Sequence, residues 1–311
     1  MSGPGDVRDL MTSLEESLDL LRDYTPDEDS FDPDLAEPMP TLLEQCANLA
    51  AAAPREQPLR SIHHMACTGG SLMCKAISVM PNVTLLSEID PLSHMGLPQR
   101  NKTPQFRPSD LIFAGRVALR PINDEVASRV GLAALEEMRR ALSDQGRLLC
   151  LRDHAHSQYC TRIDPESRPS LYDILRGHGD VISVVSVRHP MDSFLSLRQN
   201  AWVHFSPDTL EEYALRYMMF LDHHADLRLF RYEDFVAAPE TVLNDMCDAL
   251  QLPYQPGMEA ILPAVRISGD SGRSSNRISP RSRRPVPAAL EQEARDGDVY
   301  RDLCARLGYD A

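Results

Sequence analysis

The stretch SVVSVRHPMDSFLS, residues 183–196, predicts a buried strand that runs directly into a helix. Its valines are β-branched, as expected for a buried strand. Pro190 cannot continue that strand but suits the first turn of a helix. Arg188 therefore stands at the carboxyl end of a strand and beside a helix N-terminus. In open α/β sheets, this is the edge at which ligands bind.

Strand and helix patterns alternate on both sides of this stretch. Helices are predicted near 71–80, 124–143, 191–203, 208–224 and 239–250. Strands are predicted at 59–66, 147–154, 180–189 and 227–235. Such alternation predicts an α/β protein of three layers, with a mostly parallel central sheet and helices on both faces.

Composition limits the class of protein. The 311 residues are 42% hydrophobic and 25% charged, as in ordinary globular proteins. No apolar run approaches the roughly 18 residues of a membrane span, and the N-terminus lacks the apolar core of a signal peptide. We therefore expect a cytoplasmic protein without a transmembrane segment. The seven cysteines are scattered without CxxC spacing, which indicates reduced thiols rather than a zinc site or disulfides.

Charge is unevenly distributed along the chain, whose net charge is −14. Residues 1–39 hold twelve acidic residues against two arginines, and we expect an acidic helical segment and linker over 1–57, followed by one α/β domain over 58–311. Residues 266–284 hold six arginines against one aspartate, interleaved with Gly and Ser. This favours an anion-binding loop over a merely solvated one. Nucleic-acid binding is not expected, because the net charge is negative and the basic loop lacks aromatic residues.

A Gly-Gly turn in ACTGGSLMCK, residues 66–75, leads from the first predicted strand into a helix. It is either a simple tight turn or a cradle in which backbone N–H groups bind a phosphate or sulfate. The Walker A pattern is absent, because Ala76 follows Lys75 where a Ser or Thr is required.

Four segments, taken in order, resemble the sulfotransferases that use 3′-phosphoadenosine-5′-phosphosulfate (PAPS). CTGGSLM resembles the family's 5′-phosphosulfate loop, and VRHPMDSFLS resembles its 3′-phosphate motif. FRYEDFVAAPETVLNDMCDALQLP resembles the family's YEDL strand and following helix, and SGDSGRSSNRISPRSRR resembles the late loop that closes over the nucleotide. The resemblance implies a P-loop NTPase-like sulfotransferase fold and transfer of a sulfuryl group from PAPS to a hydroxyl or amine, without a metal.

The resemblance also implies roles for individual residues. Arg188 and Ser196 would hold the 3′-phosphate, and Arg273 would close the lid. The 5′-phosphosulfate would lie on a loop made of Thr68, Gly69, Gly70 and Ser71. The base is either Glu88, in LLSEIDPLS, or His154, at the position of the family's KTH motif. The acceptor is expected to be a small molecule, a glycan or a lipid.

Cys67 departs from the family pattern, which has Lys or Arg at this position of the loop. A thiol is only a weak donor and cannot offset the charge on the leaving oxygen. We expect another cation to replace it, and His63, His64, Lys75 or an arginine of 266–284 could do so. The alternatives to a sulfotransferase are a P-loop kinase or NTPase, and a non-catalytic nucleotide-binding protein of the same fold.

Overall fold

The computed structural model describes residues 41, 43, 57–95, 110–177, 179–265, 267 and 278–310. The chain divides into two compact units, Met1–Arg55 and Glu56–Ala311. The sequence analysis expected the boundary between them after residue 57. The acidic segment 1–39 lies outside the described residues.

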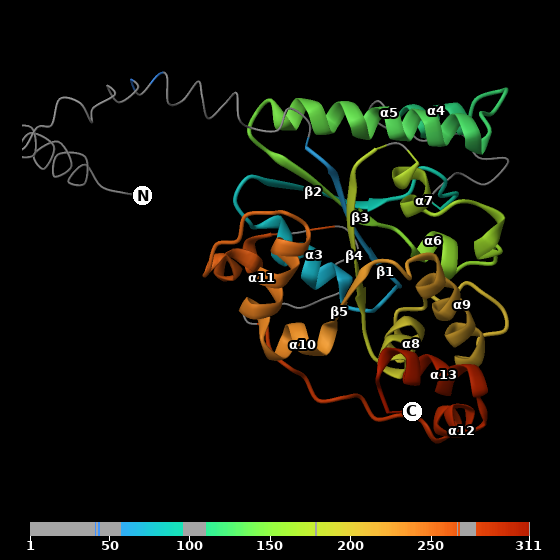
Figure 1. Cartoon of the computed structure of the whole chain (residues 1–311). Coiled ribbons are helices and arrows are strands. Elements are labelled where there is room, and N and C mark those ends of the chain that lie inside the picture. The colour runs from blue at the N-terminus through green and yellow to red at the C-terminus, as the bar shows by residue number, and fades with distance from the viewer. Residues whose placement is uncertain are drawn as a thin grey trace, which may run out of the picture. The chain divides into compact units, whose positions relative to one another are not determined.

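A parallel sheet of five strands forms the centre of this unit (Figure 1). Every strand pairs with its neighbours in parallel. The spatial order is β2-β3-β1-β4-β5. The strands are β1 (Leu59–His64), β2 (Val83–Ile89), β3 (Leu148–Asp153), β4 (Val181–Val187) and β5 (Arg228–Arg231).

Two strands differ from the sequence-based prediction. β2 was not predicted; it forms an edge of the sheet, and all its residues are only half-buried. The last strand was predicted to reach residue 235, but it ends at Arg231, and a short helix begins at Tyr232. Glu233 and Asp234 lie in the first turn of that helix, where negative charge interacts favourably with the helix dipole.

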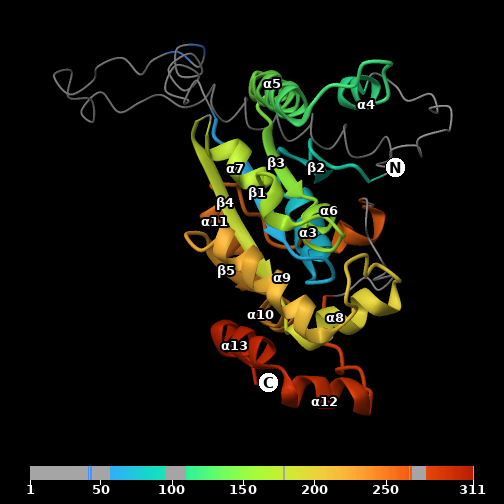
Figure 2. The same ribbon diagram turned by 90° about the vertical axis from the view of Figure 1, so that its right-hand side faces the viewer.

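Helices cover both faces of the sheet, as predicted (Figures 1 and 2). One face carries α3 (Gly70–Ser78), α10 (Tyr232–Ala237) and α11 (Pro239–Ala249). The other face carries α5 (Asp124–Ser143), α6 (His156–Tyr159), α7 (Leu171–Arg176), α8 (Pro190–Gln199) and α9 (Leu210–His223). The other helices of the described residues are α4 (Leu111–Arg116), α12 (Ala288–Asp296), α13 (Asp298–Leu307) and the 3-10 helices Pro165–Ser167 and Met258–Ala264.

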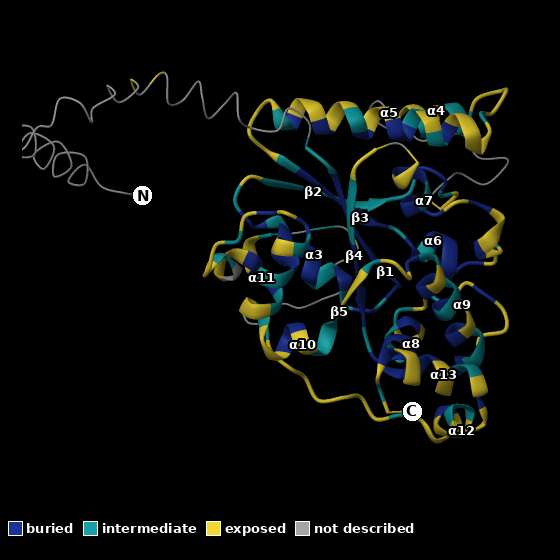
Figure 3. Ribbon diagram, viewed as in Figure 1, coloured by how far each residue is buried: buried dark blue, intermediate teal, exposed yellow. Residues whose placement is uncertain are grey.

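The core follows from the alternation of side chains along the strands. In β1, Ile62 packs in the cluster that includes α3 and α11, whereas Leu59 packs in the cluster under α5 and α7. Helix α5 buries Leu132, Leu135 and Leu142, while its outer side is exposed (Figure 3). The predicted three-layer α/β class is thereby confirmed.

The connections open a crevice at the carboxyl end of β1. The chain leaves β1 towards the α3 face, but it leaves β3 and β4 towards the opposite face. Open α/β sheets bind their ligands at such a change of direction. Among the described helices, none is long and apolar enough to cross a membrane.

Candidate active site

A cavity of about 950 Å³ lies at the carboxyl ends of the central strands. Most of the residues predicted for the site line it, although they come from α3, β2 and α8 or from the turns that follow β1, β3 and β4. These predicted residues are Gly69, Gly70, Ser71, Glu88, His154, Arg188 and Ser196. Arg273 lies outside the described residues.

Thr68 lies behind the loop rather than on the cavity wall. It is fully buried, and its hydroxyl donates to the Met65 carbonyl oxygen at 2.8 Å. Its N–H is directed to the same oxygen, at 3.4 Å. Thr68 therefore shapes the loop from within.

The loop between β1 and α3 needs its two glycines. Gly69 has φ +85°, a left-handed conformation that glycine adopts without steric cost. A methyl group at Gly69 would overlap the Tyr232 ring, and one at Gly70 would overlap the His64 ring. The N-terminus of α3 has no side-chain cap, so its first turn is directed at the cavity without a competing side chain.

Arg188 follows β4 and reaches over this loop. Its Nη1 donates to the Cys67 carbonyl oxygen at 3.2 Å, and its guanidinium lies 4.8 Å from the centre of the Tyr232 ring. Within the described part of the chain, the buried Nε of Arg188 has no hydrogen-bond partner. A buried guanidinium donor left unpaired beside a cavity favours an anion there.

Ser196 lies on α8, which begins at Pro190 as predicted, and reaches the loop at the Cys67 thiol. Asn200, one turn further along, lies 3.8 Å from the Cys67 sulfur. Burial raises the pKa of this thiol, against the opposing effect of the hydrogen bonds from Ser196 and Asn200. Cys67 therefore contributes a neutral thiol at neutral pH. Arg188 contacts the Cys67 carbonyl oxygen and Ser196 contacts its thiol, so both side chains lie next to this residue.

Arg152, near the end of β3, is a cavity-lining cation that the sequence analysis did not single out. Its side chain is 5% exposed and lines the cavity. It donates from Nη2 to the Ser71 hydroxyl, from Nη1 to the Ser87 hydroxyl and from Nε to His64, all within 2.9 Å. The signal was present, because Arg152 lies near the end of the predicted strand 147–154, as Arg188 lies near the end of the predicted strand 180–189.

The cations expected to replace the loop Lys or Arg differ in their charge and in whether they line the cavity. His64 accepts the bond from Arg152, and burial, followed by Arg152, lowers the pKa of His64 to about 3. His64 is therefore neutral at pH 7. Within the described chain, His63 and Lys75 do not line the cavity, whereas Arg281, Arg283 and Arg284 do.

The two candidate bases both border the cavity but differ in their surroundings. Glu88, in β2, has φ +60° and lies 3.6 Å from Nη1 of Arg152, with which it forms an ion pair. The His154 ring is stacked 6.0 Å from the His156 ring, between centroids. Among the described residues, no hydrogen bond reaches the His154 ring, so its nitrogens remain available to a ligand.

Comparisons with known proteins give structural neighbours only. No protein-family model matches the sequence, and no curated protein matches it. The sulfotransferase domain of the Synechococcus PCC 7002 olefin synthase is 17% identical with a TM-score of 0.49, covering 82% of this chain and 96% of that one. The sulfotransferase domain from the curacin biosynthetic pathway is 17% identical with a TM-score of 0.48, covering 82% and 99%.

Mouse sulfotransferase SULT7A1, complexed with PAP, is 12% identical with a TM-score of 0.38, covering 81% of this chain and 89% of that one. All three are sulfotransferases. At 12–17% identity, the similarity to these sulfotransferases concerns the fold.

Proposed function

We propose that this chain is a sulfotransferase that moves a sulfuryl group from PAPS to an acceptor hydroxyl or amine. One observation carries the proposal: the strand order puts the Gly69–Gly70 loop between two arginines. Arg152 lies one residue before the end of β3 on one side of β1, and Arg188 follows β4 on the other. Two cationic centres flanking a glycine loop suit a ligand with two separate anionic groups, and PAPS carries a 3′-phosphate and a 5′-phosphosulfate.

The 3′-phosphate end is assigned to Arg188 and Ser196. Arg188 and Ser196 both border the cavity next to Cys67, and the buried Nε of Arg188 has no hydrogen-bond partner among the described residues. A guanidinium and a hydroxyl together offer directed donors to a phosphate, and charge-assisted bonds of this kind are the stronger ones. Arg283 and Arg284 border the same cavity, and we propose that their segment, with Arg273, closes over the nucleotide.

The sulfuryl end is assigned to the loop N–H groups of Gly69, Gly70 and Ser71, and to Arg152. The hydrogen bond from Arg152 to the Ser71 hydroxyl holds a buried positive charge against the first turn of α3. As the bond between sulfur and the bridging oxygen breaks, negative charge grows on that oxygen. A positioned guanidinium stabilises this charge without reorganising, so Arg152 takes the role that Cys67 cannot.

His154 is assigned as the base. The acceptor oxygen attacks sulfur in line with the departing phosphate oxygen, and its proton passes to the His154 imidazole. Glu88 is engaged with Arg152 at 3.6 Å, and we assign it to positioning that arginine. The chain's contribution is thus orientation, charge neutralisation and one proton transfer.

The acceptor is expected on the His154 side of the cavity. Met95, His156, Trp202 and His204 line the wall there, with the His156 and Trp202 rings edge to face at 6.0 Å. Trp202 and His204 follow the C-terminus of α8. A small molecule, glycan or lipid with a hydroxyl group fits this mixed aromatic and polar wall.

Nucleotide selectivity tests the proposal directly. Calorimetry on the full chain should show adenosine 3′,5′-bisphosphate binding more tightly than AMP, by roughly 1.5–3 kcal/mol for one charge-assisted phosphate contact. Equal affinities would contradict the assignment. Turnover is then sought with labelled PAPS and a panel of alcohols, sugars and lipids, and selective binding without turnover on any acceptor would favour the non-catalytic alternative.

A further inference from the structure

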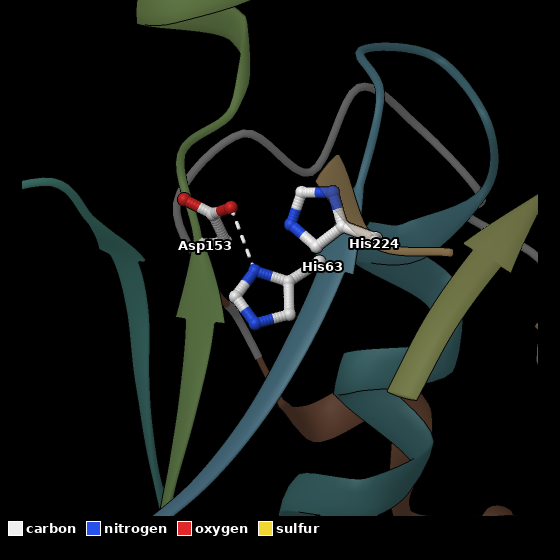
Figure 4. Close-up of side chains that lie close together, drawn as sticks. All are labelled: His63, Asp153 and His224. Atoms are coloured by element: carbon white, nitrogen blue, oxygen red, sulfur yellow. Dashed lines mark hydrogen bonds and ion pairs between the residues drawn. The ribbon is translucent and has the colours of Figure 1, made fainter. Parts of the chain in front are cut away.

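Three side chains from distant parts of the chain converge in the core on the α9 side of the sheet (Figure 4). His63 lies on β1, Asp153 ends β3, and His224 caps the C-terminus of α9. They are 0%, 4% and 1% exposed. One nitrogen or oxygen from each lies within 4.8 Å of the other two, a separation that a shared metal ion could close.

His224 leaves one ring nitrogen unsatisfied. Its Nδ1 lies 2.7 Å from the Phe220 carbonyl oxygen, so Nδ1 carries the proton and donates it to that oxygen. Nε2 is then an acceptor, and among the described residues it has no hydrogen-bond partner although it is buried. Figure 4 shows a ring nitrogen of His224 pointing towards Asp153 and His63. A buried lone pair without a donor is rare in folded proteins.

His63 is oriented in a way that suits a metal ligand. Its Nδ1 lies 2.8 Å from Asp153 Oδ2, and its Nε2 lies 2.9 Å from the Ser61 hydroxyl. Ser61 is in turn 2.7 Å from the Ser183 hydroxyl. Histidine ligands characteristically donate their other N–H to a second group, which fixes the ring. In both His63 and His224, the outer nitrogen has such a partner and the inner one faces Asp153.

We propose that His63 Nδ1, Asp153 and His224 Nε2 bind one divalent transition-metal ion. Two imidazoles and a carboxylate are the donors that Zn²⁺ and its neighbours prefer, whereas Mg²⁺ and Ca²⁺ prefer oxygen alone. A bound ion would give the buried carboxylate a full counter-charge and the His224 lone pair a partner. This differs from the sequence-based expectation that the chain binds no metal.

The ion would tie β1, β3 and the C-terminus of α9 together. Asp153 borders the cavity while its neighbour Arg152 bonds to α3, because successive strand residues point to opposite faces. Asp153 thus connects the proposed site to the cavity. The site is separate from the proposed sulfuryl transfer and does not depend on it.

Metal content and spectroscopy test the site without any activity assay. The full chain, purified without a polyhistidine tag after growth with added zinc, is analysed by plasma mass spectrometry. About one zinc ion per chain is expected. Cobalt loading of stripped protein should give visible d–d absorption, and added Zn²⁺ should raise the melting temperature of the stripped protein by binding the native state.

Two variants separate a metal ligand from a structural contact. Asp153→Asn keeps an oxygen that can accept from His63 but loses the charge, so zinc affinity should fall by roughly 10–100-fold or more. His224→Phe keeps the ring volume and removes the unsatisfied nitrogen, so it should fold yet hold no zinc. His223→Gln, at the adjacent histidine that bonds Tyr159, is the matched control and should retain the metal.

Wild-type protein with no more zinc or cobalt than His224→Phe, and with no rise in melting temperature on adding Zn²⁺, would overturn the proposal. So would a His224→Phe variant that retains the wild-type metal content. Melting curves of every variant establish that it is folded before its metal content is compared.

Discussion

Arg152 donates a hydrogen bond from Nη2 to the Ser71 hydroxyl across 2.8 Å, and so links the end of β3 to the first turn of α3. This bond brings a buried guanidinium to the loop in which Cys67 replaces a family Lys or Arg. We propose above that this guanidinium, from the neighbouring strand, supplies the missing loop charge.

Replacing Arg152 should lower turnover more than nucleotide binding. We expect Arg152→Lys to reduce kcat by roughly 10²–10³-fold, because an ammonium cannot bond Ser71, Ser87 and His64 together. Affinity for adenosine 3′,5′-bisphosphate should change little. Turnover assays and calorimetry measure the two effects. Arg140→Ala, an exposed change on α5, is the control, and equal turnover in both variants would contradict this role.

Replacing Arg188 should remove the preference for a 3′-phosphate. Arg188→Ala should weaken binding of adenosine 3′,5′-bisphosphate by about 1.5–3 kcal/mol while leaving AMP binding nearly unchanged. Arg188→Lys should recover part of the loss, because it keeps the charge without the planar fork. Titration calorimetry with both nucleotides makes the comparison. A variant that loses both ligands equally would identify Arg188 as a structural residue of the Tyr232 contact.

The base assignment predicts unequal effects at His154 and Glu88. His154→Asn should keep nucleotide affinity and lower kcat by roughly 10²–10⁴-fold. Glu88→Gln should have a smaller effect, through the orientation of Arg152 at 3.6 Å. Single-turnover measurements on both variants decide between them. The reverse ranking would make Glu88 the base, and wild-type rates in both would remove this mechanism.

Two glycine variants separate backbone strain from steric overlap. Gly69→Ala should abolish high-affinity nucleotide binding and lower stability, because its methyl group meets the Tyr232 ring and its φ is +85°. Gly146 has φ +70° and no atom within 4 Å of the added carbon. Gly146→Ala should therefore lower the free energy of unfolding only through the left-handed backbone conformation, by about 1–2 kcal/mol. Urea unfolding and calorimetry test both. Normal nucleotide binding by Gly69→Ala would contradict the close packing of the loop.

His156 should make the protein sensitive to mild acid. Burial, followed by His154 and His204, lowers the pKa of His156 to about 4 from an ordinary value of 6.5. Between these values the unfolded chain binds more protons than the folded one, so stability falls as pH drops from 6.5 to 4. In His156→Phe, the fall measured by urea unfolding should be shallower. Between pH 7 and 8 the two profiles should run parallel, and parallel profiles throughout would contradict this prediction.

The sequence by itself determined the local elements around the site. β-branched residues followed by Pro190 predicted β4 and α8, and the Gly-Gly turn predicted the loop before α3, because these patterns act within a few residues. β2 was missed because it is a half-buried edge strand, and β5 was overextended because its end depends on helix α10.

Only the tertiary structure decided which of these elements meet. In the order β2-β3-β1-β4-β5, strand β1 lies between β3 and β4, which are distant from it in the sequence. This arrangement brings Arg152 and Arg188 to opposite sides of the loop between β1 and α3. It also brings His63, Asp153 and His224 within reach of one another. Strand order depends on how distant apolar faces pack, and this packing leaves no periodic signal in any one segment.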